Sequence, residues 1–177
     1  SNDRLPPVDQ LLRCRGPDHF GTHETHFGDL TLNFTAAVLH MRGDAGAVHQ
    51  PCVSENDEQV LLWNGELFND ECFRESGKSD TLEVFRRLKE SEDVPAVLDG
   101  LEGPFAFAFF DRSKGEIWFG RDRFGRRSLL FSNDSARGLS VCSAGNASPK
   151  NEVAEVPAKG FIYRLDLASM QIHNKTC

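Results

Sequence analysis

The sequence predicts an α+β layered domain, in which antiparallel sheets are stacked and helices lie outside them. The first reason is that strand-like runs joined by short turn segments dominate the chain after Gly103, a pattern typical of hairpins. The second is that the run 105–110 (Phe-Ala-Phe-Ala-Phe-Phe) is apolar throughout, whereas a sheet with one wet face would alternate with polar residues. Because 177 residues are too few for two full domains, we expect residues 1–177 to form a single domain.

Helices are predicted only in the first hundred or so residues. Residues 8–13 have the pattern of the last turns of a helix, which Gly16 and Pro17 would end because proline lacks an N–H group. Apolar residues at 82, 85 and 88 have helical spacing, so residues 81–88 are predicted to form a helix. Residues 95–101 are predicted to add one or two further turns.

Strands are predicted from apolar runs, whereas residues 19–28 are interpreted as a loop. Within 105–110, the odd-numbered residues should face one apolar layer and the even-numbered residues the other, because successive side chains of a strand alternate. The predicted strands are 29–34, 36–41, 59–63, 105–110, 116–120, 128–131, 139–142, 160–165 and 170–173.

Composition restricts the classes of partner and location. The formal net charge of −7 has the wrong sign for holding nucleic acid, and no run approaches the roughly 18 apolar residues of a membrane span. The five cysteines are odd in number and widely spaced, which favours free thiols in a reducing compartment. We therefore expect a cytoplasmic protein that binds neither nucleic acid nor membrane. Asn-X-Ser/Thr sequons leave a secreted location open as an alternative; they lie at residues 33, 133, 146 and 174.

The segment Asn64-Gly65-Glu66 is the first candidate site, because it interrupts an apolar strand directly after Trp63. Its functional interpretation is an oxyanion hole, in which the Asn64 amide and the Gly65 N–H group converge on a developing negative oxygen. The alternative is a tight turn, since Asn and Gly are common in hairpin turns.

Arg42 and Asp80 are candidates for binding a ligand with two charged ends. A guanidinium suits a carboxylate and an acid suits an ammonium, which are the two ends of an amino acid. Arg15 and Asp18 also lie beside turns and belong to the same group of candidates. Each has a structural alternative as a solvated side chain, and Asp80 is also suited to cap a helix that begins at Thr81.

Two further clusters are interpreted as structural. Asp122 lies inside the main basic cluster, so we predict a turn whose arginines pair within the domain, with a phosphate or nucleic-acid patch as the alternative. His19, His23 and His26 are spaced like metal ligands, but a loop would not fix their geometry, so no metal site is predicted. The arginines of the basic cluster are Arg121, Arg123, Arg126 and Arg127.

Seven motifs occur in order along nearly the whole chain: Leu-Leu-Arg-Cys-Arg-Gly-Pro-Asp at 11–18, Val-Leu-His-Met-Arg at 38–42, Gln-Pro at 50–51, Trp-Asn-Gly-Glu-Leu-Phe-Asn at 63–69, Ser-Asp-Thr at 79–81, Leu-Glu-Gly-Pro-Phe-Ala-Phe at 101–107, and Gly-Arg-Asp-Arg-Phe-Gly at 120–125. In this order they resemble the glutaminase domain of class II glutamine amidotransferases, as in asparagine synthetases.

The resemblance implies an N-terminal nucleophile hydrolase fold, a four-layer αββα sandwich of two antiparallel sheets. It also implies hydrolysis of glutamine to glutamate, with the ammonia passed to a synthetase-like C-terminal domain of the same longer protein for asparagine synthesis or a related amidation. No cofactor is implied for this domain. In the family, a first-residue cysteine attacks the side-chain amide of glutamine and its own free amino group serves as the base.

The resemblance assigns roles to matching residues of this sequence. Arg42 would bind the α-carboxylate of glutamine and Asp80 its α-ammonium, with a contribution from Glu66 at the amino end. Asn64 and Gly65 would form the oxyanion hole.

The sequence departs from the family pattern at two places. Ser1 lies only fourteen residues before Arg15, without the Cys-Gly-Ile start, so we expect this chain to lack the first strand and the nucleophile and to be inactive by itself. In addition, Gly-Asp-Ala-Gly at 43–46 replaces the usual apolar residues after Arg42. The alternative function is therefore a degenerate, non-catalytic module of the same fold that binds glutamine or another protein.

Overall fold

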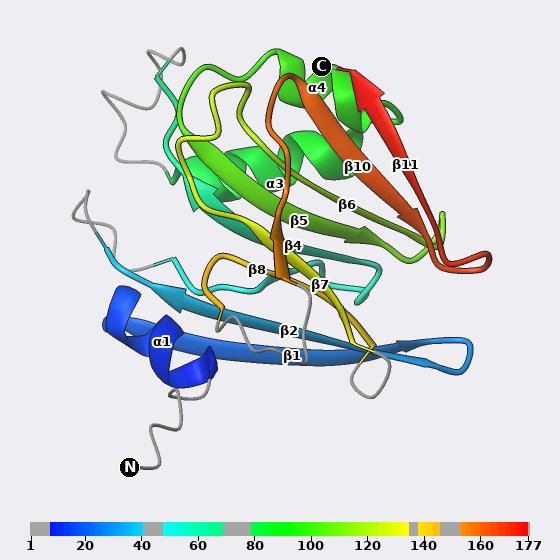
Figure 1. Cartoon of the computed structure of the whole chain (residues 1–177), viewed down its shortest axis with the longest axis horizontal. Coiled ribbons are helices and arrows are strands. Elements are labelled where there is room, and N and C mark those ends of the chain that lie inside the picture. Colours follow the sequence, from blue (N-terminus) through cyan, green and yellow to red (C-terminus); the bar gives the residue numbers. More distant parts are fainter. Residues whose placement is uncertain (1–7, 41–47, 69–78, 135–137, 146–152, 177) are drawn as a thin grey trace.

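The computed structural model of the chain describes residues 8–40, 48–68, 79–134, 138–145 and 153–176. In the described residues, one helix is followed by four strands and then by two helices, and strands follow one another from residue 105 onward (Figure 1). The helices are α1 (Val8–Arg15), α3 (Asp80–Glu90) and α4 (Val94–Asp99). The strands are β1 (His19–Phe27), β2 (Leu30–Val38), β3 (Cys52–Val53), β4 (Gln59–Gly65), β5 (Phe105–Asp111), β6 (Glu116–Arg121), β7 (Leu130–Asp134), β8 (Gly138–Cys142), β9 (Val153–Glu155), β10 (Phe161–Asp166) and β11 (Gln171–Thr176).

A six-stranded antiparallel sheet forms the centre of the domain, with its strands in the order β11-β10-β6-β5-β4-β3. Strand β5 lies inside this sheet, and both of its faces are buried. Phe105, Phe107 and Phe109 pack in the core cluster that includes α3 and α4, whereas Phe110 packs in the cluster on the opposite face. The prediction of a strand covered on both sides is therefore confirmed.

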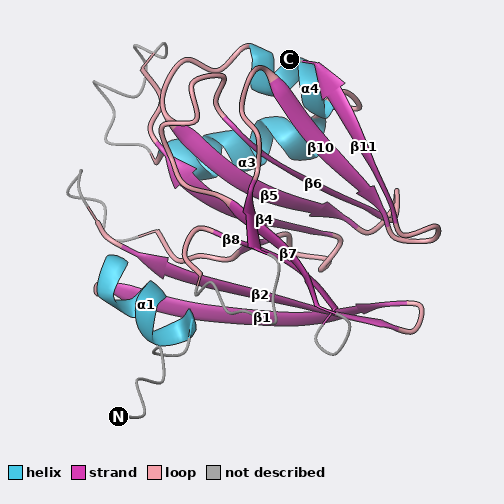
Figure 2. Ribbon diagram, viewed as in Figure 1, coloured by secondary structure: helices cyan, strands magenta, loops and turns pink. Residues whose placement is uncertain are grey.

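A second β layer covers the other face of the central sheet. It consists of the β1–β2 hairpin and a three-stranded sheet in the order β8-β7-β9. Phe34 of β2 and Leu129, next to β7, share a core cluster with Val60 and Phe110 of the central sheet. Figure 2 shows the two β layers lying between α3 and α4 on one side and α1 on the other. This arrangement is an α+β sandwich with the predicted order of layers.

The interpretation of residues 19–28 as a loop is wrong. These residues form β1, which pairs with β2 along its full length, from His19 opposite Val38 to Phe27 opposite Leu30. The strand was missed because its sequence, His-Phe-Gly-Thr-His-Glu-Thr-His-Phe, is mostly polar and has no apolar alternation. Pairing with the neighbouring strand, rather than burial of an apolar face, maintains β1.

Other boundaries differ in smaller ways. The predicted strands 29–34 and 36–41 are one strand, β2, because Thr35 continues the ladder opposite Thr22. The short strands β3 and β9 were not predicted, since two or three residues carry too little periodicity. Within the described residues, no helix is long and apolar enough to cross a membrane.

Candidate functional site

Asn64 and Gly65 are the last two residues of β4. They pair with β5, with Asn64 opposite Ala106 and Gly65 opposite Phe105. The tight-turn alternative is therefore wrong, because both residues continue the ladder of the central sheet. The chain leaves the sheet only after them, at Glu66.

Asn64 faces the space between the two β layers. Residues of β4 alternate between the two core clusters, and Asn64 lies on the same side as Val60 and Leu62, which belong to the inter-layer cluster. A cavity of about 110 Å³ lies there, and its lining includes Asn64, residues 35–37 of β2 and residues 141–143 at the end of β8. Asn64 thus supplies an amide to a largely apolar cavity.

Gly65 is at a position where the backbone leaves no room for a side chain. A Cβ atom built on Gly65 would lie 2.7 Å from Phe105 Cβ, 2.8 Å from the Pro104 carbonyl oxygen and 2.8 Å from Trp63 Cζ2. Tight packing against the start of β5 therefore requires glycine here.

Glu66 is held by backbone and side-chain contacts directly after the strand. Its N–H group donates to the Pro104 carbonyl oxygen at 3.0 Å, and its Oε1 lies 2.9 Å from Nη2 of Arg127. Gly103 allows this close approach, because it has φ of +149° and a Cβ there would lie 1.8 Å from the Glu66 carbonyl oxygen. The ion pair with Arg127 neutralises a carboxylate next to the candidate oxyanion hole.

Asp80 is brought to the end of β4 by a hydrogen bond across thirteen residues. The backbone N–H group of Leu67 donates to Asp80 Oδ2 at 2.9 Å. Asp80 is the first residue of α3 and Ser79 is the N-cap, which makes no side-chain capping hydrogen bond. The capping interpretation of Asp80 is therefore wrong: its half-buried carboxylate binds the backbone of Leu67, two residues after the end of β4.

Arg42 lies outside the described residues, but the chain that leads to it is held in place. Asp18 Oδ2 accepts a hydrogen bond from the His40 N–H group at 2.7 Å, and the Asp18 N–H group donates to the Val38 carbonyl oxygen at 3.1 Å. Arg15 Nη1 donates to Ser128 Oγ at 3.2 Å. Arg15 and Asp18 thus make structural contacts at the ends of α1 and β2.

The basic cluster forms a turn whose arginines pair within the domain, as predicted. Asp122 is buried and accepts hydrogen bonds from the N–H groups of Phe105 and Arg126 at 3.1 Å and of Phe124 at 3.0 Å. The ion pairs are Arg121–Glu155 (2.6 Å), Arg123–Asp99 (3.5 Å), Arg126–Asp122 (3.2 Å) and Arg127–Glu66 (2.9 Å).

The three histidines of the proposed metal spacing lie along β1. His23 Nε2 is 3.5 Å from Asp57 Oδ1, and His26 Nδ1 is 3.3 Å from Thr31 Oγ1. Within the part of the chain that the structure describes, no group of three or more His, Cys, Asp or Glu side chains has a metal-binding arrangement.

The described cysteines differ in environment. Burial raises the pKa of the Cys52 thiol to about 11, so this group is a thiol rather than a thiolate at neutral pH. Cys14 is exposed, and Cys142 is half-buried and contributes to the lining of the cavity beside Asn64. Each has an α-amino group within a peptide bond, so none offers the free amine that the family nucleophile uses.

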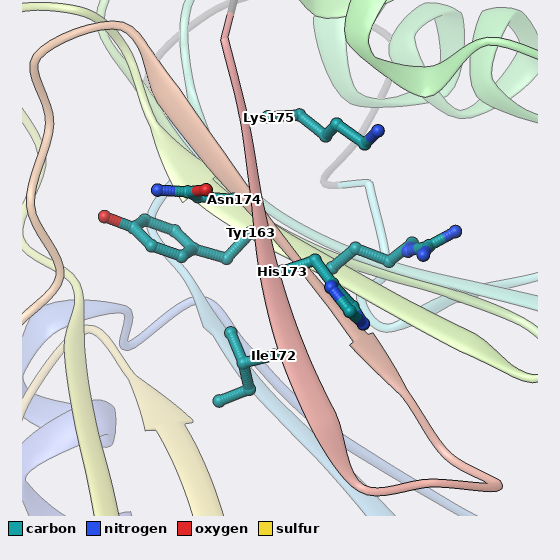
Figure 3. A pocket seen from close by; sticks show the side chains of 6 residues that line it. Tyr163, Ile172, His173, Asn174 and Lys175 are labelled. Carbon is teal, nitrogen blue, oxygen red and sulfur yellow. The ribbon is translucent and has the colours of Figure 1, made fainter.

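A larger recess, of about 420 Å³, lies elsewhere, on the β10–β11 hairpin at the far edge of the central sheet. Figure 3 shows its side chains on both sides of the hairpin, so they do not converge on a common point. None of the predicted site residues that the structure describes contributes to it, and the smaller cavity beside Asn64 is the candidate functional site. The residues of the larger recess are Tyr163, Arg164, Ile172, His173, Asn174 and Lys175.

Sequence reasoning gave no role to Gln50, although it lies in one of the motifs. Gln50 is buried, its Oε1 accepts a hydrogen bond from the Trp63 N–H group at 2.8 Å, and its Nε2 donates to the Trp63 carbonyl oxygen at 2.9 Å. The Gln-Pro motif at 50–51 was a signal that could have drawn attention to Gln50. Its hydrogen-bond partner, Trp63, was not deducible from the spacing of the motifs.

The chain is similar to one protein family and to several curated proteins. Residues 1–159 match the family described as glutamine amidotransferase domain. The chain is 37% identical over 168 residues to asparagine synthetase domain-containing protein 1 of Bos taurus, covering 91% of this chain and 25% of that protein. It is 30% identical over 168 residues to the glutamine-hydrolysing asparagine synthetase B of Escherichia coli K12, covering 90% of this chain and 29% of that protein.

Solved structures show the same fold. A glutamine phosphoribosylpyrophosphate amidotransferase from B. subtilis superposes with a TM-score of 0.68 at 18% identity, covering 96% of this chain and 45% of that chain. The chain spans about a quarter of the length of the curated relatives that it matches.

Proposed function

Because the chain belongs to the family of glutamine amidotransferase domains, we propose that it binds glutamine and serves as the glutaminase part of a longer, asparagine synthetase-like protein. The ammonia released would be used by a synthetase-like domain of that protein for asparagine synthesis or a related amidation. The relatives are about four times as long as the aligned segment, which supports a partner domain in the same polypeptide.

The observation that carries this proposal is the set of polar groups at the end of β4 and in the segment directly after it. Asn64 lines the cavity and Gly65 follows it at the end of the strand. Glu66 comes next, and the Leu67–Asp80 hydrogen bond holds the carboxylate of Asp80 at the segment that follows the strand. In the proposed site, the Asn64 amide and the Gly65 N–H group would bind an oxyanion and the Asp80 carboxylate would bind an ammonium. Arg42 would complete it by binding the α-carboxylate.

The proposed reaction proceeds through a thioester. The thiol of an N-terminal cysteine loses its proton to the free α-amino group and adds to the amide carbon of glutamine, so the amide oxygen becomes an oxyanion. The Asn64 amide and the Gly65 N–H group would stabilise that oxyanion. The C–N bond then breaks, ammonia leaves with the transferred proton, and water hydrolyses the thioester to glutamate.

The lining of the cavity beside Asn64 supports a position for a strand that bears such a cysteine. This lining includes residues 35–37 of β2 and residues 141–143 at and just after the end of β8. These strands belong to separate sheets of the second β layer. We propose that a first strand lies between β2 and β8 and presents the nucleophile to Asn64.

The first experiment measures ammonia release from glutamine. We expect none from the chain that begins at Ser1 and robust release from a form extended upstream to a Cys-Gly start, called the Cys-start form below. In that form, Cys14→Ala, which removes an exposed cysteine of α1, should leave the rate unchanged. Release by the Ser1 chain would overturn the nucleophile assignment, and silence of both forms would favour the non-catalytic module.

The second experiment tests the oxyanion hole in the Cys-start form. Asn64→Ala should lower kcat by about 10²–10³ with little change in KM, because the donor acts mainly on the tetrahedral oxyanion. The matched control is Asn33→Ala, which removes an exposed amide from β2. An effect of Asn64→Ala confined to KM would contradict the assignment.

The third experiment tests recognition of the two ends of glutamine by calorimetry. Arg42→Ala and Asp80→Ala should each weaken binding of free glutamine, as should Asp80→Asn, which removes the charge but keeps an oxygen for the Leu67 N–H group. Unchanged affinity after both Arg42→Ala and Asp80→Ala would show that neither residue binds the ligand.

A cytoplasmic location is part of the proposal, and the sequons offer a direct test. Asn33 and Asn174 are exposed on β2 and β11, where a glycan could be attached. We expect the protein from its own cells to keep the same mass after treatment with a deglycosylating enzyme. A loss of mass would place it in the secretory pathway.

A further inference from the structure

The ladder of β4 is incomplete along one edge. Strand β3 pairs only with Val60 and Leu61. At Trp63, two residues further along this edge, the partner is the Gln50 side chain, which accepts from the Trp63 N–H group at 2.8 Å and donates to its carbonyl oxygen at 2.9 Å. A hydrogen-bonded residue of an antiparallel strand offers one N–H group and one carbonyl, and a primary amide offers the same two groups. The side-chain amide of Gln50 therefore takes the place of the backbone groups that a longer β3 would offer to Trp63.

This substitution occurs one step before the proposed oxyanion hole. Alternate residues of a strand direct their N–H groups to the same edge. Since the Trp63 N–H group is directed to Gln50, the Gly65 N–H group is directed to the same edge, just beyond the Gln50 amide. Among the described residues, the last partner of β4 on this edge is therefore Gln50, which binds two residues before the backbone donor that the proposed function uses.

Gln50 is itself fixed between the two β layers. It is only 8% exposed, and its carbonyl oxygen lies 2.3 Å from the position of a Cβ built on Gly21 of β1. The ring centroids of the neighbouring His49 and of His19 on β1 are 4.1 Å apart. The backbone of Gln50 thus packs on the second layer while its amide binds the first.

We propose that Gln50 is a positioning residue for the oxyanion hole: its side-chain amide completes the β4 ladder at Trp63 and thereby sets the direction of the Gly65 N–H group and the Asn64 amide. The inference rests on the proposed function for its catalytic consequence. The positioning of the Gly65 N–H group and the Asn64 amide by Gln50 depends only on the two hydrogen bonds between Gln50 and Trp63.

The first test measures structure without activity. Gln50→Met keeps the length of the side chain and removes both hydrogen bonds. Amide hydrogen exchange followed by NMR should show protection of the Trp63 N–H group reduced about tenfold, as for loss of one hydrogen bond. Protection of the Leu62 N–H group, which is directed to β5, should be unchanged, and the amide resonances of Asn64 and Gly65 should shift.

The second test uses the pH dependence of a near-isosteric variant, Gln50→Glu, in the Cys-start form. A protonated carboxyl offers one donor and one acceptor, so it reproduces both hydrogen bonds, whereas the carboxylate offers no donor. Burial should raise the pKa of this new carboxyl above its ordinary value of about 4.3. The ratio of the variant's kcat to that of the unsubstituted form should therefore rise as the pH falls, with KM nearly unchanged.

Controls isolate the role of Gln50. Gln50→Met, which retains the nearby His19 and His49, should lower kcat at least about tenfold at every pH. Gln10→Glu, at an exposed residue of α1, should give a ratio near one throughout.

The outcomes separate this inference from the proposed function. Unchanged protection of the Trp63 N–H group in Gln50→Met, a flat pH ratio for Gln50→Glu, or an effect on KM alone would overturn the positioning role. If the unsubstituted Cys-start form releases no ammonia, the proposed function fails. In that case the exchange rates and the Asn64 and Gly65 resonances alone decide whether Gln50 positions them.

Discussion

Substituting Gly65 by alanine should destabilise the domain because β4 and the start of β5 approach too closely for a methyl group. The new Cβ would meet three heavy atoms at 2.7–2.8 Å, of which one is the Pro104 carbonyl oxygen and another is Phe105 Cβ. Neither can rotate away, so the two strands must separate by several tenths of an ångström. Overpacking of this kind costs about 1–3 kcal/mol, and we expect the upper part of that range because backbone has to move.

The assay is thermal unfolding followed by circular dichroism. For a domain of this size, about 2–3 kcal/mol corresponds to a fall in Tm of about 4–12 °C. The matched control is Gly100→Ala, at the end of α4, where φ is −76° and the nearest atoms to an added Cβ lie at 3.5 and 3.7 Å. That variant should stay within about 0.5 kcal/mol of the unsubstituted protein. If the two variants unfold at the same temperature, the packing argument for Gly65 is refuted.

Three further substitutions test the core, the pH response and the basic turn by urea unfolding. Phe107→Ala should cost about 3–5 kcal/mol because the ring is 2% exposed, whereas Phe124→Ala, at a ring 74% exposed, should change stability little; equal losses would contradict the layered core. Hydrogen bonding to Arg86 lowers the pKa of Glu83 from 4.5 to about 2, so its stabilising charge is present above about pH 4.5 and is lost as the pH falls through 2. Glu83→Gln should therefore be less stable than the parent at pH 6, and this difference in stability should shrink as the pH falls from about 4.5 through 2. A difference independent of pH would exclude this linkage. Asp122→Asn should cost about 1–3 kcal/mol, because one of two buried oxygens that accept backbone N–H groups becomes a donor; an unchanged midpoint would remove Asp122 as the organiser of the turn.

Apolar periodicity was sufficient to predict most of the central sheet and the helices over it. The run 105–110 predicted a strand buried on both faces, and the core clusters confirm it. Periodicity failed for β1, since its residues are mostly polar and the strand depends on pairing with β2 rather than on burial. It also failed for β3, because two residues are too few to show a period and the strand is defined only by its pairing with β4.

The candidate site shows the same division between local and long-range information. The motif around residue 64 identified Asn64 and Gly65, but sequence alone left a turn open, and only the register with β5 excluded it. Asp80 was equally suited to cap a helix, and the hydrogen bond from Leu67 decided against that role.

The sequence by itself therefore determined the class of fold, the strand at the centre and the order of the family motifs, because these depend on residue types and short periods along the chain. The tertiary structure decided which polar groups meet. The pairing of Gln50 with Trp63 and of Asp80 with Leu67 joins residues thirteen positions apart in both cases. A hydrogen bond depends on distances and angles that arise only when separate strands and helices pack, so such partners are absent from any local pattern.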